Sequence, residues 1–199
     1  MDVSSFNITL FRAINDLANG HPALNAVFVF FAEQMAYVLA LSMVLYWFTR
    51  TKQNRLMVIS AVVSFGIAEL LGLLAGHFVS HPQPFAALPH VNQLIPHGVD
   101  NSFPSDHSLL FFSVCVSYGL VRKKEGWLWL VVACCVAVSR VWVGVHYPGD
   151  IAAGALIGTV SALAAYRIVP KLSAVAGLLA VYENVEKRFW PVKAKGRAL

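Results

Sequence analysis

Long apolar stretches separated by short polar links dominate the pattern of this chain. Residues 26–48, 56–79, 127–145 and 151–169 each come close to the ~20 apolar residues that a helix needs to cross a bilayer. Residues 105–121 form a fifth stretch that is slightly short but nearly unbroken. The pattern predicts an all-α, polytopic membrane helical bundle with five transmembrane helices.

Amphipathic helices are expected at both ends of this bundle. In residues 4–18, apolar side chains recur every three or four positions with polar side chains between them, which is typical of a helix in the membrane interface. Residues 172–182 are apolar but too short to span the membrane comfortably. We therefore expect a single membrane domain. Its core is at residues 24–170, with an outer interfacial helix at 1–20 and a cytoplasmic interfacial helix and basic tail at 171–199.

The basic residues indicate how the bundle is oriented. With five spans, thirteen of the 15 Lys and Arg residues fall on one side of the membrane, and only Arg12 and Arg140 are left over. Lys and Arg near the ends of spans accumulate on the cytoplasmic side. The N-terminus and the loops at 80–103 and 146–150 are therefore predicted to lie outside. The net charge of +5 is a topology signal and not a sign of nucleic-acid binding.

Composition agrees with this class of protein. The chain is 58% hydrophobic and only 13% charged, which excludes an ordinary soluble domain. All three cysteines lie inside predicted spans, so we interpret them as packing residues and not as a disulfide framework or a metal site.

Two polar islands interrupt the apolar pattern, and both are predicted on the external face. The first, residues 101–108, reads Asn-Ser-Phe-Pro-Ser-Asp-His-Ser at the start of the third span. Pro104 suits the first turn of a helix, and Ser102 or Ser105 can cap it. The free amides of such a turn bind anions, and His107 could protonate a leaving oxygen. The alternative is a capped helix start whose histidine reaches the interface.

The second island comprises Ser139-Arg140 and residues 146–150. Arg140 is a permanent charge inside a span, and arginine prefers bidentate partners such as phosphate. The alternative is a structural ion pair with Glu33, Glu69 or Asp150. Because Pro148 separates them, His146 and Asp150 are expected to flank a turn. A carboxylate that holds one ring nitrogen raises the basicity of the other, which makes His146 a candidate nucleophile toward phosphorus.

Two carboxylates and a histidine-bearing loop complete the candidate residues. Glu33 and Glu69 lie inside predicted spans, where carboxylates are costly and face a protein interior or a polar cavity. Each is expected either to be neutralised within the bundle or to contribute near the site. The long loop at 80–103 carries His81 and leads directly into the first island, so we expect it to be functional.

Together the islands resemble the type 2 phosphatidic acid phosphatase (PAP2) family. The second motif of that family, Pro-Ser-Gly-His, is matched by Pro-Ser-Asp-His at 104–107. Its third motif, Ser-Arg followed by His and Asp at fixed spacing, is matched by Ser139, Arg140, His146 and Asp150. More narrowly, the sequences around both motifs are similar to the bacitracin-resistance branch, which comprises undecaprenyl-diphosphate phosphatases.

The resemblance implies a role for each residue of the two motifs. His146 would attack the terminal phosphorus to form a phosphohistidine, Asp150 would hold His146, and His107 would protonate the leaving lipid phosphate. The remaining motif residues, namely Arg140, Ser105, Ser139 and the amides of the 105–107 turn including that of Asp106, would bind the phosphate or lie beside it.

The first motif of the family is where this sequence departs. The pattern is Lys, six residues, then Arg-Pro, but Gly76 stands in the Lys place and Gln83 in the Arg place. Gln83 can still hydrogen-bond a phosphate oxygen, although it carries no charge. His77, His81 or a bound divalent cation could supply the missing charge.

The resemblance implies hydrolysis of undecaprenyl diphosphate outside the cytoplasmic (inner) membrane of a bacterium, in support of cell-wall synthesis and bacitracin resistance. No cofactor, metal, nucleic acid or obligate protein partner is expected. One alternative is another lipid substrate, such as phosphatidylglycerophosphate or phosphatidic acid, because the motifs recognise phosphate and not the tail. A second is a non-catalytic membrane subunit of a drug-export complex.

Overall fold

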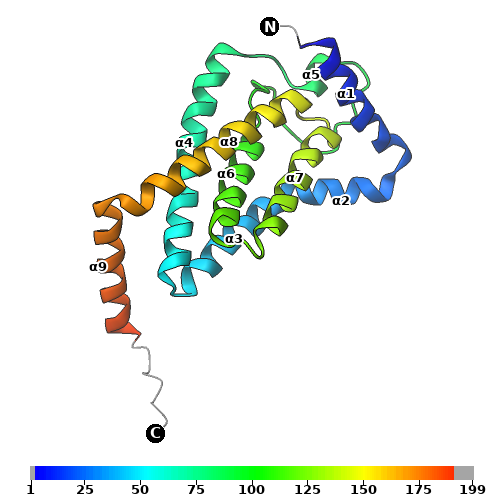
Figure 1. The fold of residues 1–199 in the computed structure, drawn as a ribbon. Coiled ribbons are helices and arrows are strands. Elements are labelled where there is room, and N and C mark those ends of the chain that lie inside the picture. Colours follow the sequence, from blue (N-terminus) through cyan, green and yellow to red (C-terminus); the bar gives the residue numbers. More distant parts are fainter. Residues whose placement is uncertain (1–2, 191–199) are drawn as a thin grey trace.

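The structure, a computed structural model, describes residues 3–190 (Figure 1). Within this range all regular structure is helical, so the predicted fold class is confirmed. The elements, in chain order, are α1 (Ser5–Asn15), η1 (Asp16–Gly20), α2 (Pro22–Glu33), α3 (Met35–Phe48), α4 (Lys52–Phe78), α5 (Pro84–Ala87), α6 (Asp106–Val121), α7 (Gly126–Trp142), α8 (Pro148–Ile168), η2 (Val169–Lys171) and α9 (Ser173–Phe189).

Helix α6 forms the centre of the bundle and packs against α4, α7 and α8 (Figure 1). Phe111, Val114 and Tyr118 of α6 are fully buried. Two glycines of α8 allow it to approach α6 closely. A Cβ atom on Gly154 would lie 2.8 Å from the carbonyl oxygen of Ser105, and one on Gly158 would lie 2.9 Å from that of Leu109. Small residues four apart are a common device for close helix contact in membranes.

Valine in place of Gly158 should therefore push α6 and α8 apart and destabilise the protein. The new side chain would meet backbone atoms of α6, which cannot move aside without shifting the helix. Overpacking of this kind costs roughly 1–3 kcal/mol. The thermal midpoint in detergent should fall clearly. Gly66→Val in α4, where a Cβ meets nothing within 4 Å, is the matched control. Equal midpoints for the two variants would contradict the packing argument.

The apolar helices make this chain a membrane protein. Among the described residues, α4 and the continuous segment Pro148–Lys171 are long and apolar enough to span a bilayer. Helices α2 and α3 pass the same test only as a pair, and α6 and α7 are apolar but shorter. These five elements correspond to the five predicted stretches, while the number that cross the membrane stays a prediction.

The first predicted span is not one straight helix. It breaks between α2 and α3 with a bend of 47°. The break falls at the polar pair Glu33-Gln34, where α2 ends and leaves carbonyl oxygens without helical partners. Ala32 contributes one of these carbonyls, which accepts a hydrogen bond from Arg140 at 3.2 Å. The sequence indicated the apolar length but not this contact.

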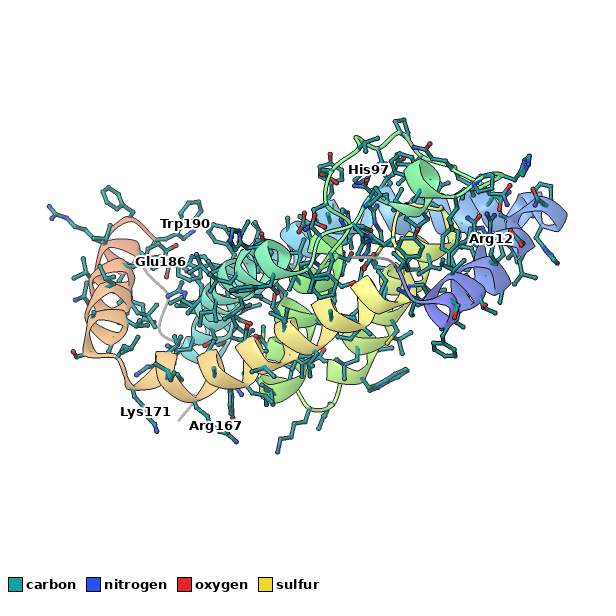
Figure 2. All side chains as sticks on the ribbon, turned by 90° about the horizontal axis from the view of Figure 1, so that it is seen from above. Arg12, His97, Arg167, Lys171, Glu186 and Trp190 are labelled. Atoms are coloured by element: carbon teal, nitrogen blue, oxygen red, sulfur yellow. The ribbon has the colours of Figure 1, made fainter. Side chains whose placement is uncertain are left out.

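Basic segments that are far apart in the sequence meet at one end of the bundle. Arg122 donates to the side chain of Asn54 at 3.0 Å, and Arg50 pairs with Glu186 of α9 at 3.1 Å. Figure 2 shows Glu186, Lys171 and Arg167 at this end, and Arg12 and His97 at the other. The predicted interfacial helix at 172–182 lies within α9 except for its first residue, Leu172, which is the N-cap. Part of the predicted basic tail, residues 191–199, lies outside the described residues.

The N-terminal helix is anchored more firmly than an interfacial helix needs to be. Asn15 is fully buried and donates to the carbonyl oxygens of Asn92 at 3.0 Å and Trp142 at 2.8 Å. Phe11 is also fully buried, with its ring edge against Tyr147. Helix α1 therefore fixes the long loop against the ends of α7 and α8.

Candidate active site

The end of α7, the first turns of α6 and α8, and the long loop meet at the α1 end of the bundle. The turn between α7 and α8 sets the positions of the third-motif residues. Gly144 has φ +85°, and Pro148 starts α8. The amide of Tyr147 donates to Asp150 Oδ2 at 2.9 Å and caps the helix. His146 lies before the helix, so the two residues do not share one, but Asp150 lies in the first turn of α8 and does not follow a turn.

One nitrogen of His146 is already engaged. Its Nδ1 lies 3.0 Å from the carbonyl oxygen of Ser102, which can only accept a hydrogen bond. Nδ1 therefore carries the hydrogen and Nε2 is left with a free lone pair. Burial lowers the pKa of His146, and the opposing effect of the nearby Asp150 carboxylate is smaller. The imidazole is thus neutral near pH 7, with Nε2 able to act as a nucleophile.

Asp150 does not hold His146 directly, which corrects the sequence-based expectation. Asp150 Oδ2 is 3.8 Å from His146 Nδ1, too far for a hydrogen bond. Instead it accepts from the hydroxyl of Ser102 at 2.7 Å. Asp150 Oδ1 lies 3.2 Å from Nε2 of His81, so the loop histidine belongs to the site.

Arg140 is buried and only partly satisfied. Its side chain donates to the Ala32 carbonyl through Nη1, while Nε has no partner among the described residues. No carboxylate of the described chain lies within 4.0 Å of it, so the ion pair considered as an alternative is not formed. The carboxylates of Asp106 and Glu33 act on it only at longer range. A buried guanidinium with free donors is suited to an anionic ligand.

The first turn of α6 supplies further donors. Ser105 is the N-cap, but its hydroxyl makes no capping bond and has no partner within residues 3–190, although the residue is fully buried. Pro104 precedes the cap and lies outside the helix, so its expected place in the first turn was wrong, whereas Ser105 is one of the two residues expected at the cap. The Ser105 amide donates to the Asp150 carbonyl at 3.2 Å, which ties α6 to α8. The amides of residues 106–108 precede the first helical hydrogen bond, which is donated by Leu109, and they form the positive end of the helix dipole.

Three imidazoles share this region. His107 interacts electrostatically with Arg140, His146 and His97. The ring centroids of His97 and His146 are 6.1 Å apart. Candidates for a nucleophile and a proton donor therefore lie together with a set of anion donors, and phosphoryl transfer needs groups of these kinds.

Several predicted residues lie elsewhere. His77 is exposed, and its only ring contact in the described chain is with Phe78. The Ser139 hydroxyl donates within α7, to the carbonyl of Val136 at 2.6 Å. Asp106 and Glu69 line a separate cavity of about 270 Å³, where their carboxylates would repel phosphate.

Gln83 is committed to another partner. The residue is fully buried, its amide nitrogen donates to the carboxylate of Asp100, and its amide oxygen accepts from the Asp100 backbone at 3.1 Å. This reciprocal pair holds the long loop together. Any contact between Gln83 and phosphate stays a prediction.

Two site residues were missed from the sequence. Ser102 was considered only as a helix cap, and His97 was not singled out among the residues of the long loop. Ser102 lies two residues before the second motif, and nothing in the sequence there indicates that its carbonyl faces His146. Only the folding of the loop over the end of α7 brings these side chains to the motif residues.

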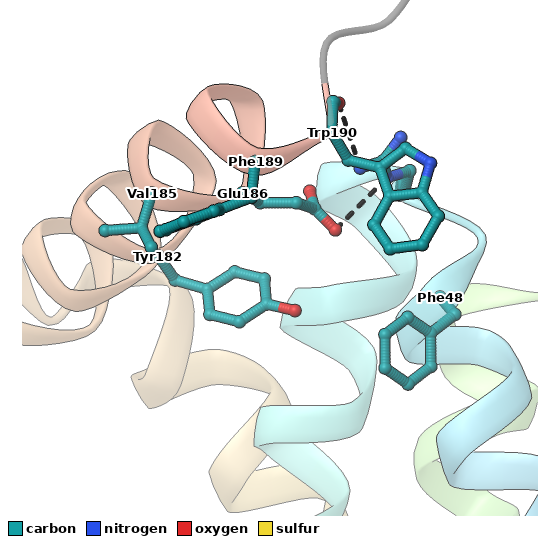
Figure 3. A pocket seen from close by; sticks show the side chains of 7 residues that line it. Phe48, Tyr182, Val185, Glu186, Phe189 and Trp190 are labelled. Atoms are coloured by element: carbon teal, nitrogen blue, oxygen red, sulfur yellow. Dashed lines mark hydrogen bonds and ion pairs between the residues drawn. The ribbon is translucent and has the colours of Figure 1, made fainter.

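A larger cavity at the opposite end is unrelated to this chemistry. It measures about 470 Å³ and lies between α3 and α9, with mainly apolar walls (Figure 3). Its charged residues, Arg50 and Glu186, pair with each other, and Arg50 also donates to the Trp190 carbonyl at 3.3 Å. None of the candidate site residues lines this cavity.

Comparison with known proteins gives the class of this chain. Residues 57–174 match the PAP2 superfamily, so the chain belongs to that family. It is 55% identical over 195 residues to a Bacillus licheniformis protein named bacitracin transport permease protein BcrC, covering 98% of this chain and 96% of the relative. It is 29% identical over 184 residues to undecaprenyl-diphosphatase BcrC of Bacillus subtilis (strain 168), covering 90% and 93%.

A solved structure supports the fold. The crystal structure of LpxE from Aquifex aeolicus superimposes with a TM-score of 0.74 at 26% identity, covering 84% of this chain and 98% of that one. The helical arrangement expected from the motifs is therefore the arrangement that the chain adopts.

Proposed function

We propose that this chain hydrolyses undecaprenyl diphosphate to undecaprenyl phosphate and orthophosphate. The observation that carries the proposal is the free Nε2 of His146 in a site that also holds Arg140, which acts on the ring electrostatically. Two buried donors of this site, Ser105 Oγ and Arg140 Nε, have no partner in the described part of the chain. The name of the Bacillus subtilis relative supports the substrate.

The reaction proceeds in two steps. In the first, the lone pair of His146 Nε2 forms a bond to the terminal phosphorus, and the bridging P–O bond breaks. The bond electrons pass to the leaving undecaprenyl phosphate oxygen, which takes a proton from His107. In the second, water attacks the phosphohistidine, neutral His107 takes its proton, and the N–P bond electrons return to His146 as orthophosphate leaves.

The fixed donors stabilise charge in both transition states. Negative charge spreads over the equatorial phosphoryl oxygens, and donors in place before the reaction do not have to reorganise. Arg140 supplies a permanent charge, Ser105 a hydroxyl, and residues 106–107 their amides at the start of α6. The Asp106 side chain takes no part, because a carboxylate repels phosphate.

The site faces the outside of the cytoplasmic membrane in this proposal. The clustering of Arg50, Arg122 and α9 at the opposite end supports that orientation. A diphosphate exposed at the outer face is accessible there, so expression of the chain should raise bacitracin tolerance.

Another membrane function is favoured by one observation, the permease name of the Bacillus licheniformis relative. A non-catalytic export subunit has no need of buried donors left free beside a neutral histidine, since these cost stability. A different lipid phosphate is the nearer alternative, because the site residues bind phosphate and none of them identifies a tail.

The test is phosphate release by the purified chain in detergent. We expect the highest kcat/KM with undecaprenyl diphosphate, and lower values with phosphatidylglycerophosphate and phosphatidic acid. The rate should be unchanged in a strong chelator, because the nucleophile and the charge come from side chains. If no phosphate is released from any of the three lipids, the proposed phosphatase activity is refuted. If another lipid is preferred, that lipid replaces undecaprenyl diphosphate as the proposed substrate.

The acid side of the pH profile gives a separate prediction. His146 must be neutral to attack, and its lowered pKa keeps it neutral below the ordinary value of 6.5. As the pH is decreased, we expect kcat/KM to fall only when the pH reaches the lowered pKa of His146, below 6.5. The measurement is a pH series of initial rates. An acid limb centred above 6.5 would contradict the electrostatics described above.

A further inference from the structure

We propose that Ser102 is the positioning residue of the nucleophile. Its carbonyl fixes the tautomer of His146, and its hydroxyl connects Asp150 to the ring. The inference deepens the proposed function, on which its kinetic consequences rest.

The three polar groups of Ser102 are all engaged. The amide donates to the His81 carbonyl at 2.9 Å, the carbonyl accepts from His146 Nδ1 at 3.0 Å, and the hydroxyl donates to Asp150 Oδ2 at 2.7 Å. The hydroxyl oxygen is also 3.3 Å from His146 Nδ1. The residue is fully buried, so no solvent can take over these roles.

The carbonyl decides which ring nitrogen is free. A backbone carbonyl has no hydrogen to donate, so the nitrogen facing it must be the protonated one. A carboxylate at 3.8 Å could not impose this by itself, because it is beyond hydrogen-bond distance. The tautomer needed for attack by Nε2 is therefore set by the backbone of Ser102 and should survive loss of the charge on Asp150.

The hydroxyl decides how strongly Asp150 acts on the ring. It supplies one of the two donors to Oδ2, the other being the Tyr147 amide, and His81 lies beside Oδ1. Without the hydroxyl, Oδ2 is less neutralised and can move toward Nδ1. A closer, less neutralised carboxylate stabilises the protonated imidazole.

Other charged groups around His146 act in parallel. Arg140 of α7, His107 of α6 and the loop histidines His81 and His97 are the same in both proteins, whereas Asp150 of α8 is the group on which the hydroxyl acts. A shift in the titration of His146 in Ser102→Ala therefore reports the hydroxyl through its effect on Asp150.

The first test reads the tautomer without activity. The full chain is labelled with ¹⁵N-histidine in detergent, and the His146 signals are assigned by their loss in His146→Gln. We expect the Nδ1–H form in the parent and also in Asp150→Asn. A mixture of tautomers, or the Nε2–H form, in Asp150→Asn would show that Asp150 determines the tautomer of His146. That result would overturn the proposed role of the Ser102 carbonyl.

The second test reads the hydroxyl. In Ser102→Ala the titration of His146 should move to higher pH than in the parent. In Ser102→Cys, which keeps a weak donor, it should lie between those of the parent and Ser102→Ala. Ser117→Ala is the matched control, since this buried serine donates only to the Ser113 carbonyl within α6, at 2.7 Å. An unmoved titration in Ser102→Ala, with the thermal midpoint retained, would overturn the hydroxyl role.

Kinetics separate this inference from the proposed function. For Ser102→Ala we expect kcat to fall about tenfold, the effect of one hydrogen bond to a charged group, with KM little changed. A substrate that is not undecaprenyl diphosphate, or a chain without activity, would refute the proposed function and leave both ¹⁵N results unaffected. A purely structural serine would lower the thermal midpoint and the amount of active protein but not move the titration.

Discussion

Alanine in place of His146 should reduce phosphate release from undecaprenyl diphosphate by about three orders of magnitude or more. The variant keeps the phosphate donors but has no lone pair to form the covalent intermediate. Water cannot efficiently replace the ring as the nucleophile, because in the parent the attacking atom is held in place by the hydrogen bond from His146 to the Ser102 carbonyl. The expected loss is in kcat, since Arg140 and Ser105 still bind the phosphate.

The measurement is initial-rate phosphate release, combined with trapping of phosphoenzyme by an alkaline detergent quench from substrate labelled in the terminal phosphate. The parent should show an acid-labile phosphoenzyme and His146→Ala none. His90→Asn is the matched control: His90 is an exposed loop histidine with φ 51°, a conformation that asparagine tolerates. More than a tenth of the parental rate in His146→Ala would exclude His146 as the nucleophile.

Valine in place of Gly144 should strongly reduce both stability and activity. The glycine has φ +85°, which a β-branched residue adopts only with strain. A Cβ there would also lie 2.6 Å from the carbonyl oxygen of Asn92. Together these costs should amount to about 2–5 kcal/mol, from the left-handed conformation and from overpacking against backbone.

The effect on activity should exceed the effect on folding. The turn at Gly144 places the His146 amide on the Arg140 carbonyl at 3.3 Å, so any shift there moves the nucleophile. Thermal midpoint and kcat are the measurements. The control is Gly98→Val in the long loop, where a Cβ meets nothing within 4 Å. A Gly144→Val protein as stable and active as this control would show that the turn is not needed.

The chemistry of the motifs could be predicted because it is written in short, local patterns. Pro148 between His146 and Asp150 predicted that the two residues do not share a helix, and His146 does precede α8; however, Pro148 begins that helix, and the turn lies before His146, at 143–145. The apolar lengths predicted helices at five stretches because burial in lipid requires them. The bend at Gln34 could not be predicted, because it is stabilised in part by Arg140, more than 100 residues away.

Three residues have surroundings that differ from the expectation for a similar reason. Asp150 was expected to hold His146 because the two are four residues apart, but the distance between their atoms depends on Ser102 from another segment. His77 is close to the first motif in sequence, yet it is exposed at the end of α4. Gln83 fits the motif frame, and its amide is paired with Asp100 across the loop.

The sequence by itself determined the class of this protein: an all-helical membrane bundle whose charges indicate its orientation and whose motifs predict phosphate chemistry. Periodicity, charge and motif spacing are local properties, so they can be read along the chain. Only the tertiary structure decided which nitrogen of His146 is free, which donors lack partners and that Ser102 links Asp150 to the ring. These depend on distances of a few ångströms between α6, α7, α8 and the long loop, and packing alone sets such distances.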